Sequence, residues 1–254
     1  MKITVLGCGT STGVPMIACD CPVCTSRDIR NKRTRSSILI SGGQKNVLID
    51  TSTDLRHQSL KNNVRNVNAV LFTHCHADHV HGIDELRSFN FVQKESIPCY
   101  GDENTLNRIK QMFSYIFKKN NIGGGIPDIS LNTLPGEETV EIGGISFTPI
   151  SVIHGNMPIL GYRFNNVAYI TDCSEIPAPS MDKLQALDIL ILDALRHRPH
   201  NTHFNIEEAL DVVAHLKPKK TFFTHLSHEV DYESTMSSLP DGVSLAYDGM
   251  IINA

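Results

Sequence analysis

Residues 73–82 read THCHADHVHG and place four potential metal ligands in a His-x-His-x-Asp-His pattern. On an extended segment, side chains two positions apart point to the same side, so His74 and His76 can bind one metal ion. If the chain then turns into a helix, Asp78 and His79 can face a second ion. Imidazole and carboxylate groups suit zinc, manganese or iron. The pattern therefore predicts a centre with two divalent metals. An apolar strand before it and a helix after it disfavour a solvated histidine tract.

Several apolar segments that we predict to be strands run directly into a histidine or an aspartate. The segments and the residues that follow them are AVLFT with His74, FTPISVI with His154, VAYIT with Asp172, KTFFT with His225, DILIL with Asp193 and NVLI with Asp50. Such residues lie along one rim of a sheet, and the carboxyl ends of strands are where the sites of α/β proteins assemble. Asp50 is expected either to fix the position of a metal ligand or a loop without binding the metal itself, or to be purely structural.

A second group of potential ligands lies near the N-terminus, where ACDCPVC (residues 18–24) contains Cys19, Cys21 and Cys24. The opening MKITVLGCGT is too short and too broken by glycine for a signal peptide, so we expect a cytoplasmic protein with reduced thiols. The count of 7 cysteines is odd, which disfavours a complete disulfide framework. Zinc ligation explains the cluster better.

A tetrahedral structural zinc needs four ligands, and the cysteine cluster supplies three of them. The segment THLSHEVD offers two histidines, His225 and His228. If the predicted catalytic centre uses the first, His228 is available as the fourth zinc ligand. On the residues alone, the ligands that compete with it are Asp20, His57 and Cys173.

The elements that must position these groups are strands interspersed with helices. Predicted strands and hairpins cover residues 2–7, 36–50, 69–73, 97–100, 139–153, 159–171, 188–194, 220–224 and 243–247. Predicted helices cover residues 52–63, 84–93, 103–117 and 206–216. The first helix is expected to begin at a Ser or Thr cap, and the last at a capping box made by Asn205 and Glu208. Strand-rich halves that also carry helices predict two packed sheets covered outside by helices.

Composition narrows the class of protein. The chain has 254 residues, of which 41% are apolar, and a formal net charge of -4. This apolar fraction supports a substantial core, and no overall polycation favours nucleic acid as a partner. We expect no membrane association, because the apolar run at the N-terminus is far too short to span a bilayer. At least half of the 12 histidines lie in residues 74–81 and 197–203, which again points to metal.

The His-x-His-x-Asp-His motif and the order of the later histidine and aspartate residues resemble the metallo-β-lactamase superfamily. The resemblance covers essentially the whole chain and implies an α/β fold, an αββα sandwich, with residues 1–254 as a single hydrolase domain. By the same resemblance, the first metal would be held by His74, His76 and His154. The second would be held by Asp78, His79 and His225, and Asp172 would bridge the two ions.

Three further segments resemble the PhnP group of this superfamily, whose namesake hydrolyses phosphoribosyl 1,2-cyclic phosphate. They are CDCPVC after a glycine-rich opening, THLSH, and the C-terminal LPDGVSLAYDGMIINA. The resemblance implies a structural zinc held by Cys19, Cys21, Cys24 and His228. It also implies that His203 stabilises the transition state or protonates the leaving oxygen, while His200 is a weaker candidate for substrate contact.

We therefore expect a metal-dependent phosphodiesterase with two catalytic ions, zinc or manganese. A pair of divalent ions lowers the pKa of a bridging water to about 7, which supplies hydroxide for attack on phosphorus. Asp78 would orient that water or accept its proton. The expected substrate is a small phosphodiester, cyclic in one version of the hypothesis.

Four other functions remain as alternatives. A ribonuclease Z-type RNA processing enzyme shares the metal ligands, but no insertion here is large enough for its tRNA-binding arm. A thioester or lactam hydrolase is a further enzyme hypothesis, less favoured because Asp78 and His203 suit phosphoesters. A non-catalytic PqqB-like protein of cofactor biosynthesis shares the cysteine pattern. A di-iron oxygen-reducing protein usually has glutamate at the place of His76.

Several remaining features receive weaker predictions. Cys8, Cys75, Cys99 and Cys173 are expected to be small core residues. The basic stretch RDIRNKRTR (residues 27–35) is expected to be a solvated face, with nucleic acid as a less favoured partner. Arg196 and Arg198 are expected to be solvated, or to bind phosphate. Residues 118–128 would form either a mobile flap over the pocket or a simple connection, and a homodimer is left open.

Overall fold

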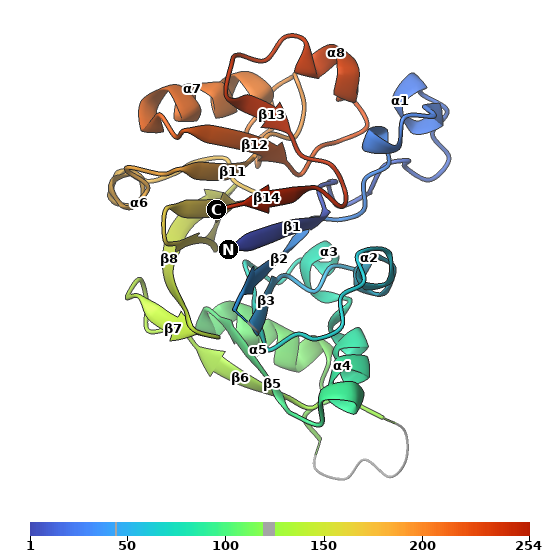
Figure 1. The fold of residues 1–254 in the computed structure, drawn as a ribbon, viewed down its shortest axis with the longest axis vertical. Helices are drawn as coiled ribbons and strands as arrows, with labels where there is room; N and C mark the ends of the chain where they lie inside the picture. The colour runs from blue at the N-terminus through green and yellow to red at the C-terminus, as the bar shows by residue number, and fades with distance from the viewer. Residues whose placement is uncertain (44, 119–124) are drawn as a thin grey trace.

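The computed structural model describes residues 1–43, 45–118 and 125–254, and the strands in these ranges form two seven-stranded sheets (Figure 1). The first sheet has the spatial order β14 (Ile251–Asn253), β1 (Lys2–Gly7), β2 (Ser37–Gly42), β3 (Lys45–Ile49), β4 (Ala69–Leu71), β5 (Ile97–Gly101) and β6 (Ile129–Thr133). The second has the order β13 (Val243–Leu245), β12 (Lys220–Thr224), β11 (Ile189–Asp193), β10 (Val167–Ile170), β9 (Met157–Phe164), β8 (Ile145–His154) and β7 (Val140–Ile142).

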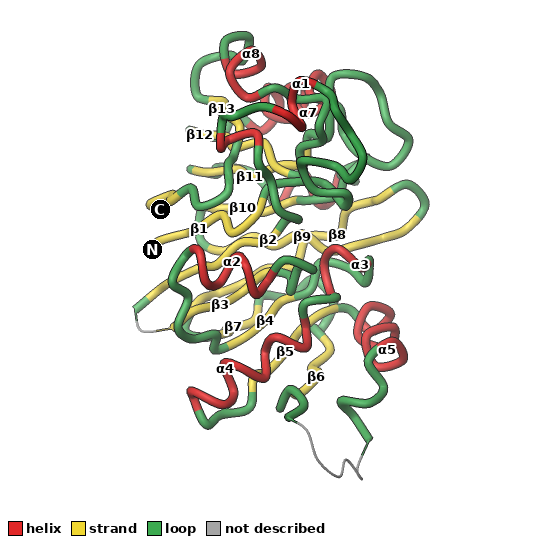
Figure 2. Tube along the Cα trace, turned by 90° about the vertical axis from the view of Figure 1, so that its right-hand side faces the viewer, coloured by secondary structure: helices red, strands yellow, loops and turns green. Residues whose placement is uncertain are grey.

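Helices cover the outer face of each sheet, as Figures 1 and 2 show. The first sheet is covered by α2 (Leu55–Lys61), α4 (Leu86–Gln93) and α5 (Glu103–Met112). The second is covered by α6 (Ala178–Lys183), α7 (Ile206–Leu216) and α8 (Tyr232–Met236). The short helices α1 (Pro22–Thr25), α3 (Ala77–Val80), η1 (Ile29–Asn31) and η2 (Ile83–Glu85) lie in connections. This is the predicted αββα arrangement.

The strands are apolar on both faces because each sheet is covered on both sides. In β10, Val167 and Tyr169 pack into the core between the two sheets, where they meet residues of β1 to β4. The alternate residues, Ala168 and Ile170, pack into the separate core under the helices of the second sheet. Successive side chains of this buried strand thus point alternately into two hydrophobic cores. The residues that follow the strand lie at the edge of the sheet where the polar groups gather.

Two of the predicted helices differ from the structure at their ends. Helix α2 begins after Asp54, not after a Ser or Thr cap, and the Asp54 side chain makes no capping hydrogen bond. Its carboxylate instead accepts from the backbone and guanidinium of Arg35, while the Ser52 hydroxyl donates to Gln58. Helix α5 ends at Met112, five residues before the predicted boundary at residue 117. The helix ends early although Phe113 and Ile116 still pack on the core that the periodicity detected.

Helix α7 begins as the sequence predicted. The Asn205 side chain accepts from the Glu208 amide at 2.9 Å, and the Glu208 carboxylate accepts from the Asn205 amide at 2.9 Å. The reciprocal bonds satisfy two backbone donors that the first turn would otherwise leave without partners. The cap also fixes the entry of the segment that carries His203, two residues earlier.

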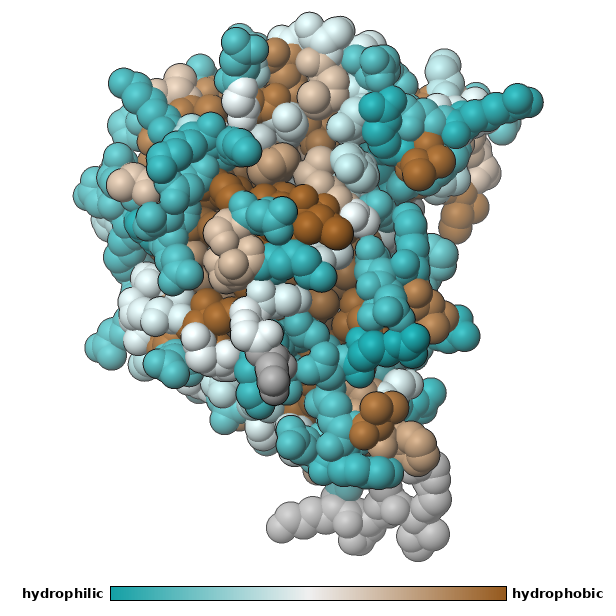
Figure 3. Space-filling model, viewed as in Figure 1, coloured by the Kyte–Doolittle hydropathy of each residue, from teal (hydrophilic) through white to brown (hydrophobic). Residues whose placement is uncertain are grey.

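The surface is mostly hydrophilic on the face drawn in Figure 3, with apolar side chains in scattered patches. None of the helices in the described ranges combines the length and the apolarity that crossing a bilayer requires.

We predict that Asn205→Ala lowers the free energy of unfolding by about 1 kcal/mol, because it removes the side-chain half of the capping box. Urea denaturation followed by circular dichroism measures the change. Asn253→Ala is the matched control, because the Asn253 side chain is exposed and makes no hydrogen bond with a described residue. Equal effects of the two substitutions would contradict the assignment.

Candidate metal centre and active site

The predicted ligands converge at the carboxyl ends of β4, β8, β10 and β12. Potential ligand atoms of His74, His76 and His154 lie within 4.8 Å of one another. A second set, also within 4.8 Å, contains Asp78, His79, Asp172 and His225. Helix α3 supplies Asp78 and His79 immediately after the extended segment that carries the first two histidines. The turn from an extended segment into a helix therefore lets one short motif contribute to both sets.

The two sets meet at Asp172. One carboxylate oxygen, Oδ2, lies 3.8 Å from His74 Nε2 and 3.3 Å from His225 Nε2. The other, Oδ1, lies 3.2 Å from His79 Nε2. Asp172 thus faces both groups of ligands at once, which is the position that the resemblance implied for a bridging residue.

The backbone at the strand ends is unusual. Asp50, Asp172 and His225 have φ values of 64°, 54° and 58°, which places all three in the left-handed region. Few residues other than glycine adopt this region, although aspartate and histidine tolerate it better than most. The left-handed residue ends each strand abruptly and directs its side chain into the rim. Local backbone strain is thus used here to position the polar groups.

The buried atoms of the site fit a pair of divalent cations. Four atoms of the two ligand sets have no hydrogen-bond partner within the described part of the chain: His74 Nε2, His79 Nε2, His225 Nε2 and Asp78 Oδ2. The same holds for His225 Nδ1 and Asp193 Oδ1, which lie 3.6 Å apart. A buried polar atom without a partner costs roughly 1–3 kcal/mol, and native proteins contain few of them. A cluster of such atoms with imidazole and carboxylate chemistry is the donor set that zinc or manganese would satisfy.

Hydrogen bonds fix the opposite ring nitrogens of His74, His79 and His154. His79 Nδ1 lies 2.8 Å from Asp50 Oδ2, and Thr73 donates its amide and its hydroxyl to the same carboxylate. Because the Thr73 hydroxyl donates to Asp50, it accepts from His74 Nδ1 at 3.0 Å. His154 Nδ1 donates to the Thr202 carbonyl at 2.7 Å. Each bond leaves Nε2 pointing into the site. Of the two roles considered for Asp50, the structure shows the first.

Charge interactions set the protonation states of the site. Burial alone would raise the pKa of Asp172, but His225 and His79 hold it well below its usual value. Burial would lower the pKa of His79, but Asp172 and Asp50 hold it well above its usual value. Burial, reinforced by His79, lowers the pKa of His74. These interactions favour the ionised form of Asp172 and the neutral form of His74.

His203 lies at the edge of the two ligand sets. One of its ring nitrogens is within 4.8 Å of the ligand atoms of His154 and Asp172. Its Nδ1 lies 3.0 Å from Asp193 Oδ2, which also accepts from the Cys173 amide at 2.9 Å. The sequence indicates Asp193 only as a residue at the end of a strand. In the structure, Asp193 is the residue that orients His203. His200 is exposed and accepts weakly from the Thr202 amide, at 3.3 Å.

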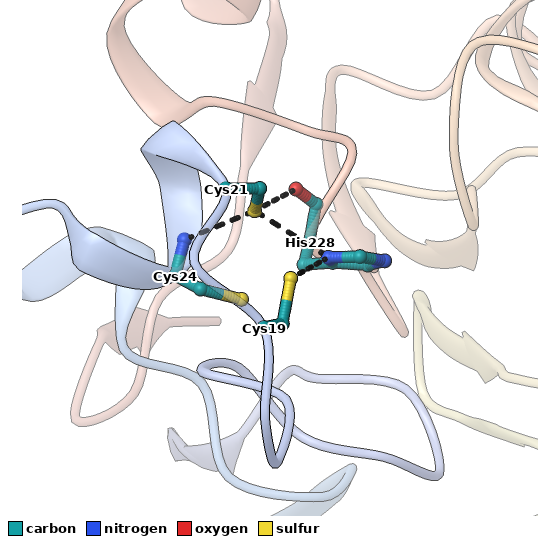
Figure 4. Close-up of side chains that lie close together, drawn as sticks. All are labelled: Cys19, Cys21, Cys24 and His228. Carbon is teal, nitrogen blue, oxygen red and sulfur yellow. Dashed lines mark hydrogen bonds between the residues drawn. The ribbon is translucent and has the colours of Figure 1, made fainter.

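The three cysteines of the N-terminal loop gather around His228, as Figure 4 shows. His228 Nδ1 lies 3.2 Å from Cys19 Sγ and 3.5 Å from Cys21 Sγ. The Cys24 amide donates to Cys21 and is the main cause that lowers the pKa of the Cys21 thiol to about 6. Asp20, His57 and Cys173 are not in this group. Four soft or borderline ligands in one cluster fit a tetrahedral zinc.

Comparison with known proteins places the chain in a family. The sequence profile of the Beta-lactamase superfamily domain matches residues 45–226. The chain belongs to the metallo-β-lactamase superfamily. A crystal structure described as a new diphosphatase from the PhnP family is 41% identical, with a TM-score of 0.93, and the match covers 100% of this chain and 97% of that one. The predicted PhnP-like group is thereby confirmed.

Two further matches are less similar in sequence to this member of the metallo-β-lactamase superfamily. Zinc-bound PqqB from Methylobacterium extorquens is 21% identical with a TM-score of 0.80, over 100% of both chains. An octanoyltransferase of Porphyromonas gingivalis is 35% identical over 253 residues, which are 98% of this chain. The chain spans only 51% of that longer protein.

Arg33 contradicts the prediction that residues 27–35 form a solvated face. Its side chain is 1% exposed. The guanidinium donates to the carbonyls of Ser227 and Val230 and to the Asn31 side chain. The prediction failed because charge alone does not show that several carbonyls of a distant loop converge on one residue. Arg33 thus ties the segment after the cysteine loop to the segment that carries His225 and His228.

Other weak predictions have mixed outcomes. Cys8, Cys99 and Cys173 are buried as predicted, but Cys75 is half-buried and lines a cavity beside His74, so its assignment to the core was wrong. Arg196 and Arg198 both pair with Glu229, which explains why neither is simply solvated. Of the proposed flap, residues 119–124 lie outside the described residues.

We predict that Cys21→Ser releases one equivalent of metal from the purified protein and lowers Tm by about 10 °C, because structural zinc contributes directly to folding. Metal content by mass spectrometry and thermal unfolding are the two measurements. Asp20→Asn is the control, because Asp20 is an exposed residue of the same loop outside the cluster. Unchanged metal content in Cys21→Ser would show that the cysteines are not ligands.

We also predict that Arg33→Met lowers the free energy of unfolding by about 3 kcal/mol, since it leaves buried carbonyl groups without donors. Arg30→Met provides the comparison. Arg30 makes solvent-accessible ion pairs with Asp28 and Glu233, which contribute little to stability because water screens them. Chemical denaturation distinguishes the two, and a smaller effect for Arg33 than for Arg30 would refute the structural role.

Proposed function

We propose that this protein is a dinuclear metal-dependent hydrolase of small phosphoesters. The observation that carries the proposal is the meeting of two ligand sets at Asp172, with His203 at their edge. His74, His76 and His154 would hold one cation, Asp78, His79 and His225 would hold the other, and Asp172 would contribute to both. When bound, such a cation pair supplies Lewis acidity that activates water and neutralises charge on phosphoryl oxygens.

Two residues of the chain would move protons. Asp78 Oδ2 is buried and lies 3.3 Å from His79 Nε2 and 3.8 Å from His225 Nε2, so its carboxylate is placed to orient the attacking water and accept its proton. The contact between His203 Nδ1 and Asp193 leaves His203 Nε2 available to donate a proton to the leaving oxygen.

The substrate class rests on shared chemistry. In a phosphodiester and in a diphosphate diester, the phosphorus atom is bonded to two bridging oxygens, one of which leaves during hydrolysis. The 41% identity to a diphosphatase supports attack at such a centre. Nucleic acid is less favoured, because Arg30, Arg35, Arg196 and Arg198 are all engaged by carboxylates of the protein.

A structural zinc and a cytoplasmic location complete the proposal. Cys19, Cys21, Cys24 and His228 would hold the zinc. Thiolate ligation of this kind requires reduced cysteines, which the cytoplasm maintains.

A substrate panel tests the proposal with zinc-loaded and manganese-loaded protein. The panel contains bis-p-nitrophenyl phosphate, cyclic nucleotides, a ribose cyclic phosphate, a dinucleoside diphosphate, pre-tRNA, octanoyl-CoA and a cephalosporin. We expect turnover of a phosphodiester or a diphosphate. Turnover confined to octanoyl-CoA or the cephalosporin would reject the proposal, and no turnover at all would favour a PqqB-like binding protein.

We predict that Asp172→Ala reduces phosphoester turnover at least about 10³-fold and also reduces the amount of bound metal, because the bridging carboxylate is lost. Metal content and steady-state kinetics are measured together. Asp182→Ala, at an exposed position of α6, is the control. Full activity in Asp172→Ala would rule out the proposed centre.

A further inference from the structure

Helices α2 and α4 both cover the outer face of the first sheet (Figure 2), and a groove of about 290 Å³ lies between them. The groove has an apolar lining, to which α2 contributes Leu60 and α4 contributes Phe89 and Val92. Val64, on the connection after α2, lines it too. None of the described residues that line the groove is a predicted metal ligand, so the groove is separate from the predicted metal centre.

The two helices use only one face each for folding. Leu55 of α2 and Phe89 of α4 pack in the core under the first sheet. Leu60 and Val92 remain 66% and 69% exposed, and Phe91, beside Val92 on α4, is 74% exposed. A single exposed apolar side chain is ordinary, but apolar side chains that gather at one groove mark an interaction surface. The two helices therefore place apolar groups where the fold itself does not need them.

The edge of the groove carries cations that the protein leaves unpaired. Arg56 of α2 and Arg65 of the following connection both line the groove, and Glu85 is the only carboxylate among the described residues that do so. Neither arginine side chain makes an ion pair or a hydrogen bond with any residue that the structure describes, and the same holds for the Lys61 side chain at the end of α2. Several arginines elsewhere do pair with carboxylates, among them Arg30, Arg35 and Arg198.

The shape and the charge of the groove fit an amphipathic helix. Such a helix places apolar side chains at i, i+3, i+4 and i+7 along one face, and a groove between two helices accepts that face. Acidic side chains beside the apolar face would meet Arg56 and Arg65, and arginine binds a carboxylate through two parallel donors. The charge also selects among partners, because the same arginines would repel a helix flanked by lysine.

Two other occupants fit the groove less well. A second copy of the chain that docked through this surface about a two-fold axis would bring the unpaired arginines of both copies together. Such a contact is repulsive. An anionic bilayer would attract the same arginines, but its surface is flat, whereas Leu60, Val64 and Val92 line a hollow between two helices.

We propose that the groove between α2 and α4 is a docking surface for an acidic amphipathic helix of a partner protein. The apolar face of the partner helix packs on Leu60, Val64 and Val92, and its carboxylates pair with Arg56 and Arg65. This inference goes beyond the proposed function, because it involves no residue of the predicted metal centre.

Synthetic peptides test the surface by fluorescence anisotropy. One peptide is a helix with leucine along one face and glutamate beside it, and a second carries lysine in place of glutamate. A third has the residues of the first in an order that forms no apolar face. We expect the glutamate peptide to bind at least about tenfold more tightly than either of the others. A benzophenone group on this peptide should crosslink to α2 and α4.

Substitutions in the groove localise the binding. Arg65→Glu and Val92→Asp should each weaken binding of the glutamate peptide at least about tenfold, because the first reverses a charge at the edge and the second places a carboxylate in the apolar lining. Lys110→Glu and Ile251→Asp are the matched controls, because each makes the same kind of change at an exposed position outside the groove. They should change the affinity by less than about twofold. Circular dichroism verifies that every variant is folded.

The docking surface would be refuted by equal binding of the glutamate and lysine peptides, by no binding of any peptide, or by unchanged affinity in both groove variants. Two further measurements identify a different occupant. Binding to vesicles of phosphatidylglycerol and phosphatidylcholine reports a membrane, and sedimentation reports self-association. If wild type shows only one of these interactions and both Arg65→Glu and Val92→Asp lose it, the groove serves a membrane or a second copy, and docking of a partner helix is wrong.

Discussion

The site depends on polar atoms that are removed from water and yet are not satisfied by the protein itself. His74, His79 and His225 are each 1% exposed or less, and their Nε2 atoms face one another across Asp172. A hydrogen bond to the other nitrogen of a ring holds that ring in place. Asp50 and Thr73 do this for two of the rings. Burying polar atoms without partners costs free energy, and a bound cation would remove that cost. The fold therefore holds the ligand atoms in place through hydrogen bonds that do not depend on a substrate.

The two sheets supply the stiffness that this arrangement needs. Strands that are buried on both faces end at a common rim, and their last residues turn sharply there. Arg33 also connects distant parts of the chain. It donates to the carbonyls of Ser227 and Val230, on the segment that carries the predicted ligands His225 and His228. The cysteine cluster contacts the same segment through His228. Both features contact the segment that follows His225 in the chain.

Sequence patterns predicted much of this arrangement because they combine residue type with regular spacing. The alternation of strands, the capping box at Asn205 and the residues at the strand ends all follow such local rules. The parts that failed depend on distant contacts. The burial of Arg33 requires carbonyls about two hundred positions away in the chain. The role of Asp193 becomes visible only when β11 places it against His203, and the position of Cys75 on a cavity wall depends on how α5 packs.

The left-handed backbone at Asp50, Asp172 and His225 has a consequence for how the protein can change over evolutionary time. A branched or bulky side chain at these positions would be strained whether or not the protein still catalysed a reaction. A descendant that had lost its activity would therefore tend to keep aspartate, asparagine, histidine or glycine there for conformational reasons alone. His76, which is exposed and has φ of -66°, is under no such conformational restriction. Among related chains, a retained histidine at that position is the better indicator of preserved catalysis.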